Sequence, residues 1–190
     1  MSFRVVVTPE DARDNGYILK PLVERMLAEC GRPNARVEVL NTPRARGYNQ
    51  AKTFLADHVF DSYRQHDLIL FLPDADGKDR SEEFRRLEQI AGTKGARLLC
   101  CAGIQEIEVW LLAGHIAKLS ASWDQVRANL QVKETIFRPF LAQHGNRMAP
   151  GEGRAELMKE TLQNYNGLLG KCPELNALQE RVKQALAGSQ

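Results

Sequence analysis

Long apolar runs, a strong net charge and metal-binding cysteine pairs are all missing from this sequence. No stretch approaches the roughly 18 consecutive apolar residues that a membrane-spanning helix needs. The net charge is only +2, from 26 basic and 24 acidic residues, so no strong overall field directs the chain to nucleic acid or to a membrane surface. Local basic patches are still compatible with this balance. The composition predicts an ordinary globular protein that does not act in a membrane.

The cysteines and histidines give no sign of a structural zinc site. The four cysteines form no CxxC pair, and the four histidines share no ligand spacing. The chain turns charged almost at once, in MSFRVVVTPEDARDN, which is not the pattern of a secretory signal. We therefore expect a reduced, cytoplasmic protein.

Short apolar runs alternate with longer amphipathic stretches over the first two thirds of the chain. This order predicts parallel strands joined by right-handed helical crossovers. Pro21 is expected in the first turn of the first helix. The fold class is therefore predicted as α/β, a short parallel sheet of about four strands with helices on both faces. The predicted strands span 3–7, 35–41, 67–73 and 96–103, and the predicted helices span 17–30, 48–65, 81–92 and 106–119.

The pattern changes after residue 119. Several amphipathic segments follow with no strand among them, and 144–154 is the one loop rich in glycine and proline. We expect an α/β domain over 1–119 and a helical extension over 120–190. The helices of this C-terminal appendix could form a surface for a homo-oligomer or for another partner.

Acidic residues follow three of the four predicted strands. Ligands bind outside the carboxyl ends of parallel strands, so these side chains should meet at one edge of the sheet. Mg²⁺ and Mn²⁺ prefer such oxygen ligands, and two carboxylate clusters could hold two ions for phosphodiester cleavage. The predicted metal ligands are Glu10 and Asp14 after the first strand, Asp74 and Asp76 after the third, and Glu106 and Glu108 after the fourth.

Each of these acidic residues also has a simpler structural interpretation. Asp74 and Asp76 could form Asx turns or helix caps. Glu10, Glu106 and Glu108 could favour the positive end of a helix. The metal site is favoured because these acidic residues all fall at one edge of the predicted sheet. Acidic residues with unrelated structural roles should be scattered over the surface.

The loop after the second strand is basic. Arg44 and Arg46 lie in it, and Lys52 follows in the next helix. Phosphate groups of nucleic acids are commonly bound by such side chains. These three residues are predicted phosphate contacts, although a solvated loop is the better explanation of the two arginines taken alone.

A Glu after strand one and a DxD followed by Gly after strand three resemble the TOPRIM domain of topoisomerases, primases and OLD-type nucleases. The resemblance covers roughly residues 3–119 and is closest to small TOPRIM-like proteins of bacterial defence and mobile-element operons. The segment EIEVWLLA, 106–113, is also similar to one in those proteins. One departure is Pro9, which stands where the family has a Gly before its first Glu.

This resemblance implies a metal-dependent nuclease that uses Mg²⁺ or Mn²⁺. Its catalytic residues would be Glu10, Asp74, Asp76 and Glu108, and a catalytic lysine would have to be Lys133 or another lysine. DNA rather than RNA is the expected nucleic acid, with an ATPase as partner protein and antiviral defence as the setting.

Two other functions stay open. A catalytically inactive TOPRIM-like scaffold would serve as an interaction subunit of the same complex, since a fold alone does not grant activity. A phosphatase built on the DxD strand end would need a Ser or Thr and a Lys on neighbouring strand ends, and this pairing is not evident.

Overall fold

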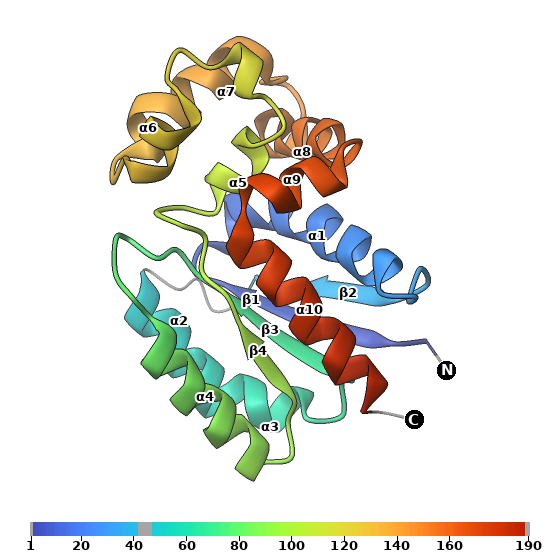
Figure 1. Ribbon diagram of the computed structural model, residues 1–190. Coiled ribbons are helices and arrows are strands. Elements are labelled where there is room, and N and C mark those ends of the chain that lie inside the picture. The colour runs from blue at the N-terminus through green and yellow to red at the C-terminus, as the bar shows by residue number, and fades with distance from the viewer. Residues whose placement is uncertain (1, 42–46, 189–190) are drawn as a thin grey trace.

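The computed structural model describes residues 2–41 and 47–188. These residues form one four-stranded sheet in the order β2-β1-β3-β4, in which every pairing is parallel (Figure 1). The predicted α/β class, with a short parallel sheet, is confirmed. The strands are β1 (Arg4–Pro9), β2 (Arg36–Val39), β3 (Leu68–Leu72) and β4 (Leu98–Cys100).

The central strands are apolar because both of their faces are covered. All five residues of β3 are buried, and so is β1 after its first residue. Val5 and Val7 face one layer of helices, whereas Val6 faces the other. Two-sided burial is typical of parallel sheets.

The helices of the first half follow the predicted order with shifted boundaries. Asp11 caps α1 by accepting a hydrogen bond from the Arg13 N–H, so this helix begins at Ala12 instead of residue 17. Pro21 consequently lies inside the helix, not in its first turn. The elements are α1 (Ala12–Glu29), α2 (Tyr48–Phe54), a π-helical turn (Leu55–Val59), α3 (Phe60–Tyr63) and α4 (Ser81–Thr93).

After β4 the described residues form helices and no further named strand, as predicted for 120–190. The first of these helices, α5, is much shorter than the predicted 106–119. The elements are α5 (Glu108–Leu112), a 3-10 turn (Ile116–Lys118), α6 (Trp123–Ala128), a π-helical turn (Lys133–Phe137), α7 (Arg138–His144), a 3-10 turn (Pro150–Gly153), α8 (Arg154–Leu162), α9 (Tyr165–Lys171) and α10 (Pro173–Ala187). No helix in 2–41 or 47–188 is long and apolar enough to cross a membrane.

The helices form two layers around the sheet. One face packs against α2, α3 and α4, and the other packs against α1, α5 and the C-terminal helices (Figure 1). On the face covered by α1, α5 and the C-terminal helices, one apolar core includes residues from Val5 in β1 to Leu186 in α10. The predicted extension over 120–190 therefore shares its core with the sheet.

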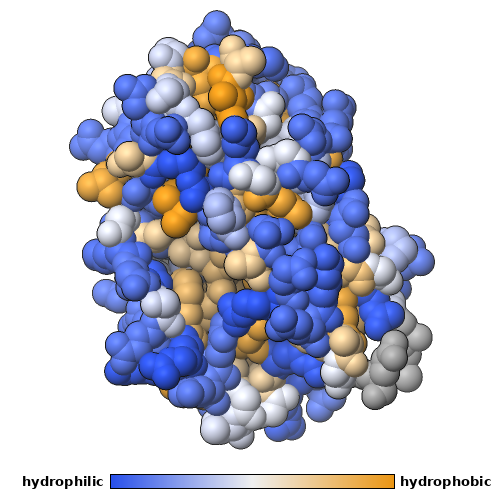
Figure 2. Space-filling model, viewed as in Figure 1, coloured by the Kyte–Doolittle hydropathy of each residue, from blue (hydrophilic) through white to orange (hydrophobic). Residues whose placement is uncertain are grey.

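The edge strand β4 is bridged by side chains of α4 and α10. The Cys100 N–H donates to Glu88 Oε1 at 2.8 Å, and the Cys100 carbonyl accepts from Arg181 Nη1 at 3.1 Å. An ion pair of 2.7 Å joins Glu88 to Arg181. This bridge occupies the outward N–H and carbonyl groups of Cys100, which hinders the pairing of another strand at this edge. An apolar hollow of about 440 Å³ lies beside it, and its lining includes Phe84, Ile104 and Leu178. Figure 2 shows this hollow between α4 and α10.

Candidate metal centre

The segment that follows β3 makes a tight turn. Asp76 and Gly77 have φ values of 51° and 69°, and the Lys78 N–H donates to the Ala75 carbonyl at 3.0 Å. Aspartate and glycine tolerate this left-handed backbone better than most residues. Leu130 also packs onto the turn, and its Cδ2 would lie 2.6 Å from a Cβ at residue 77. The turn thus needs a glycine at this position for its conformation and for this contact.

The loop that follows β4 is hydrogen-bonded to this turn. The Ala75 N–H donates to the Gly103 carbonyl at 3.0 Å. Farther along, the Ile107 N–H donates to Asp74 Oδ1 at 2.7 Å, and this bond is buried. These bonds hold the ends of β3 and β4 together and so bring their carboxylates to one place.

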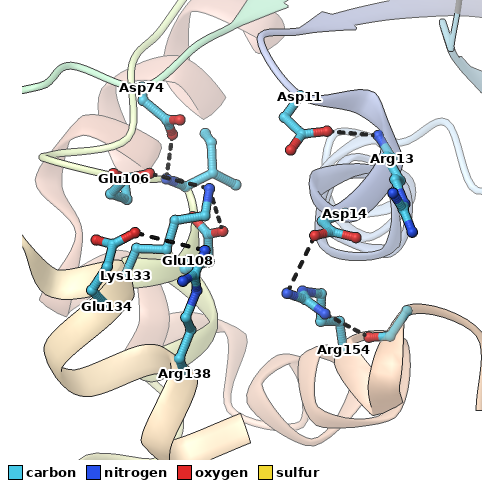
Figure 3. Close-up of polar contacts among 12 residues, drawn as sticks. Asp11, Arg13, Asp14, Asp74, Glu106, Glu108, Lys133, Glu134, Arg138 and Arg154 are labelled. Atoms are coloured by element: carbon cyan, nitrogen blue, oxygen red, sulfur yellow. Dashed lines mark hydrogen bonds and ion pairs between the residues drawn. The ribbon is translucent and has the colours of Figure 1, made fainter. Parts of the chain in front are cut away.

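Asp74, Glu106 and Glu108 form what we call the acidic cluster. Each contributes one carboxylate oxygen, and these three atoms lie within 4.8 Å of one another. Asp74 is only 5% exposed and Glu108 is fully buried. Figure 3 shows the three side chains gathered around the Lys133 amine. The structure therefore brings together three of the six predicted metal ligands.

Lys133 enters the acidic cluster from the π-helical turn that precedes α7. Its Nζ lies 3.1 Å from Glu108 Oε1 and 3.6 Å from Glu106 Oε2. Burial lowers the pKa of Lys133, but the charges of Glu108, Glu106 and Asp74 outweigh burial, so its pKa is raised. Lys133 is therefore a stable ammonium group that neutralises part of the acidic charge. It is the lysine named from the family resemblance.

Burial is the main influence on the pKa values of Asp74 and Glu106. It raises the pKa of Asp74 well above its usual range, and the charges of Glu106 and Glu108 raise it further. The Ile107 N–H and Lys133 act in the opposite direction. Burial also raises the pKa of Glu106, with Lys133 opposing and Glu108 adding to the effect. Because these two pKa values are raised, protons would compete with a metal ion for Asp74 and Glu106.

Glu10 lies immediately after β1 and faces the same edge. Its Oε2 is buried and has no hydrogen-bond partner. Burial raises the pKa of Glu10, the charge of Asp76 raises it further, and the Asp74 backbone, Arg80 and Lys133 lower it. Glu10 is therefore in electrostatic range of the metal centre, although it is not a member of the acidic cluster.

The remaining two predicted ligands lie outside the acidic cluster. Asp76 is half-exposed, and its Oδ2 lies 3.6 Å from Arg80 Nη2. Asp14 is farther away, with its Oδ2 3.5 Å from Arg154 Nη2, and Figure 3 shows this pair apart from the acidic cluster. Glu10 and Asp14 do not share a helical face because α1 begins after Glu10.

The predicted phosphate contacts receive little support. Arg44 and Arg46 lie outside the described residues. Lys52 Nζ forms an ion pair of 2.5 Å with Glu83 Oε1, and Glu83 also accepts a hydrogen bond from the Tyr48 hydroxyl at 2.7 Å. Lys52 is thus already engaged by a neighbouring side chain.

Arg80 stands at the same edge, although the sequence analysis assigns it no role. Its side chain is only 10% exposed. The guanidinium carbon lies 3.4 Å from the centroid of the Tyr48 ring. Asp76 and Arg80 lie four residues apart in the segment between β3 and α4, and this acidic–basic pair is the sequence signal that could have indicated it.

Buried polar atoms without a hydrogen-bond partner gather at this edge. Such atoms are rare in proteins and often mark the place of a water or an ion. Positive φ angles at Asp76 and Gln105 add backbone strain to the same two loops. With three hard oxygen donors, the acidic cluster fits a divalent cation such as Mg²⁺ or Mn²⁺. The unpartnered atoms near the strand ends are Thr8 Oγ1, Glu10 Oε2, Arg80 Nε, Gln105 Oε1 and both carboxylate oxygens of Glu108, of which Oε1 still has its ion pair with Lys133.

No protein-family model, curated protein or solved structure matches this chain. The TOPRIM resemblance therefore stays a prediction, and the function has to be inferred from the geometry of the metal centre.

Proposed function

We propose that this chain binds Mg²⁺ or Mn²⁺ through Asp74, Glu106 and Glu108 and hydrolyses phosphodiester bonds of nucleic acid. The observation that carries the proposal is the state of Glu108. This carboxylate is fully buried, has the Lys133 ammonium at 3.1 Å as its one partner among the described residues, and lies beside two further carboxylates. Burying such a group is costly unless a cation compensates it. Lys133 compensates one negative charge, which leaves the rest of the acidic cluster for a divalent ion.

The other acidic residues have supporting roles in this proposal. Glu10 and Asp76 flank the acidic cluster and would hold a second ion or orient the attacking water. A divalent ion, when bound, supplies Lewis-acid activation of water and neutralises charge that develops on the phosphate. The Lys133 ammonium would hold an oxygen of the phosphate as its negative charge grows.

The biological setting follows from the family resemblance. We propose DNA rather than RNA as the substrate, an ATPase as the partner protein, and a cytoplasmic defence or repair complex as the setting.

The test is cleavage of supercoiled DNA in the presence of Mn²⁺. Glu108→Gln keeps the size of the side chain and removes a buried charge, so cleavage should fall by about 100-fold or more. Glu134→Gln is the matched control, because Glu134 lies one residue beyond Lys133 and, among the described residues, pairs only with Arg138, at 3.8 Å. The nuclease proposal fails if wild type and Glu108→Gln cleave at the same rate.

A non-catalytic scaffold is the second candidate, and one observation favours it. The Lys133 ammonium already sits beside Glu106 and Glu108, where it can substitute for a metal ion. A lysine in this position would let the fold persist without metal as an interaction subunit. Titration calorimetry separates the two candidates, since the scaffold would bind neither Mg²⁺ nor Mn²⁺ at millimolar concentration.

A further inference from the structure

Arg80 is a buried arginine whose hydrogen-bond donors are unused. Its guanidinium makes no hydrogen bond to any described residue, and its Nε is buried without a partner. Its two ion pairs, 3.6 Å to Asp76 and 3.9 Å to Glu83, are too long to be hydrogen bonds. They neutralise the charge without a hydrogen bond, so the buried Nε–H donor has no partner among the described residues. Such a group is costly to keep unless a ligand uses it.

The guanidinium is held in a fixed orientation. It stacks on the Tyr48 ring, and the Tyr48 hydroxyl donates to Glu83, which Lys52 also holds. Stacking fixes the plane of the guanidinium and leaves its edge free to donate hydrogen bonds. The Lys52–Glu83–Tyr48 contacts therefore support Arg80 rather than acting on a ligand themselves.

Arg80 lies next to the metal centre. Its positive charge lowers the pKa of Glu10, and it pairs with Asp76 of the DxD turn. Asp76 is half-exposed, so its side chain can rotate away and release Arg80 Nη2.

We propose that Arg80 binds phosphate, with its planar fork donating two hydrogen bonds to the oxygens of a phosphodiester in a polynucleotide. A fixed guanidinium matches two phosphate oxygens, which a lysine ammonium cannot do. The choice of a polynucleotide rests on the proposed nuclease function. The phosphate contact itself rests on the unused donors of Arg80.

Oligonucleotide binding tests the proposal with a variant that keeps the charge. Arg80→Lys should weaken the binding of a fluorescent single-stranded oligonucleotide by about tenfold, measured by anisotropy without metal. Arg86→Lys is the matched control, because Arg86 is an exposed α4 residue that pairs with Glu82. Equal affinities of wild type and Arg80→Lys would overturn the proposal.

A second measurement covers the case in which Arg80→Lys does not fold. In a heteronuclear correlation spectrum of the wild-type arginine N–H groups, the Arg80 Nε signal should move on addition of the oligonucleotide and of inorganic phosphate. Movement with phosphate alone would mean a free-phosphate site and would overturn the polynucleotide ligand. No movement with either probe would overturn the anion site itself.

The same spectrum separates this inference from the proposed function. Glu108→Gln should lose metal binding and cleavage but keep the shift of the Arg80 signal. Absence of cleavage would therefore not affect the shift of the Arg80 Nε signal. Absence of that shift would in turn not affect metal-dependent cleavage.

Discussion

At the scale of single residues, Lys133 decides how the metal centre behaves. Its ammonium lies within 3.1 Å of Glu108 and 3.6 Å of Glu106, the two carboxylates that a metal ion would also need. Two cations so close together repel each other strongly in a buried environment. A metal ion and Lys133 should therefore compete for the acidic cluster until one of them shifts.

Replacing Lys133 by methionine tests this competition. Lys133→Met should bind Mn²⁺ about tenfold more tightly, because the competing ammonium is gone. Without metal the variant should be less stable by about 2 kcal/mol, since two buried carboxylates lose their cation. Calorimetry measures the first effect, and thermal unfolding with and without Mn²⁺ measures the second.

Lys159→Met is the control, because Lys159 is exposed on α8 and forms no ion pair in the described part of the chain. Weaker Mn²⁺ binding by Lys133→Met than by wild type would show that the ammonium supports metal binding instead of competing with it.

At the scale of elements, the loops after β3 and β4 form one unit. The backbone of the β4 loop passes so close to itself that a Cβ at Gly103 would lie 2.8 Å from the Ile107 nitrogen and 2.9 Å from the Glu106 carbonyl carbon. The Gly103 N–H donates a hydrogen bond to the Pro73 carbonyl, and the Gly103 carbonyl accepts one from the Ala75 N–H in the loop after β3. Gly103 therefore sets the path of the segment that carries two of the three clustered carboxylates.

Gly103→Ala should disturb this unit. The added methyl group clashes with backbone, so we expect a loss of stability of about 1–3 kcal/mol. Metal affinity should also fall, because Glu106 and Glu108 would shift with the loop.

Gly92→Ala is the matched control for this substitution. Gly92 lies inside α4, and no atom lies within 4 Å of the position that a Cβ would take. Alanine there should raise the free energy of unfolding by about 0.5–1 kcal/mol. Thermal unfolding and metal titration of both variants measure these effects. Unchanged metal affinity in Gly103→Ala would mean that the β4 loop does not set the ligand geometry.

The sequence predicts the elements better than their ends. The central strands were predictable because β1 contains three consecutive valines and β3 is apolar throughout. Asp74 and Glu108 were predictable because parallel strands end at one edge. The predicted helix over 106–119 ends instead at Leu112, where the Thr161 hydroxyl of α8 donates to the Leu111 carbonyl at 2.7 Å. Such a tertiary contact leaves no periodic signal in the local sequence.

The positions of Lys133 and Arg80 show the same limit within the candidate site. Lys133 reaches the acidic cluster only because the chain folds back over the sheet after α6, and no local pattern specifies that path. The role of Arg80 depends on Tyr48, which comes from a different element, α2.

At the scale of the whole molecule, the helical second half is part of the α/β core. α1 packs against α8, and one apolar core includes Val7 of the sheet together with Met158 and Val182 of the C-terminal helices. Trp110 in α5 donates a hydrogen bond to Glu174 in α10 at 2.9 Å. Contacts of this kind do not allow the sheet and the C-terminal helices to unfold separately.

The protein should therefore unfold in a single cooperative transition. In urea, the fluorescence of Trp110 and Trp123 should change at the same midpoint as the far-UV circular dichroism, with a slope of about 2 kcal/mol/M. A fragment of residues 1–119 should not fold, because it leaves the apolar face of α1 uncovered and lacks Lys133. Two separate transitions, or a sharp transition in the fragment, would show that the second half is an independent domain.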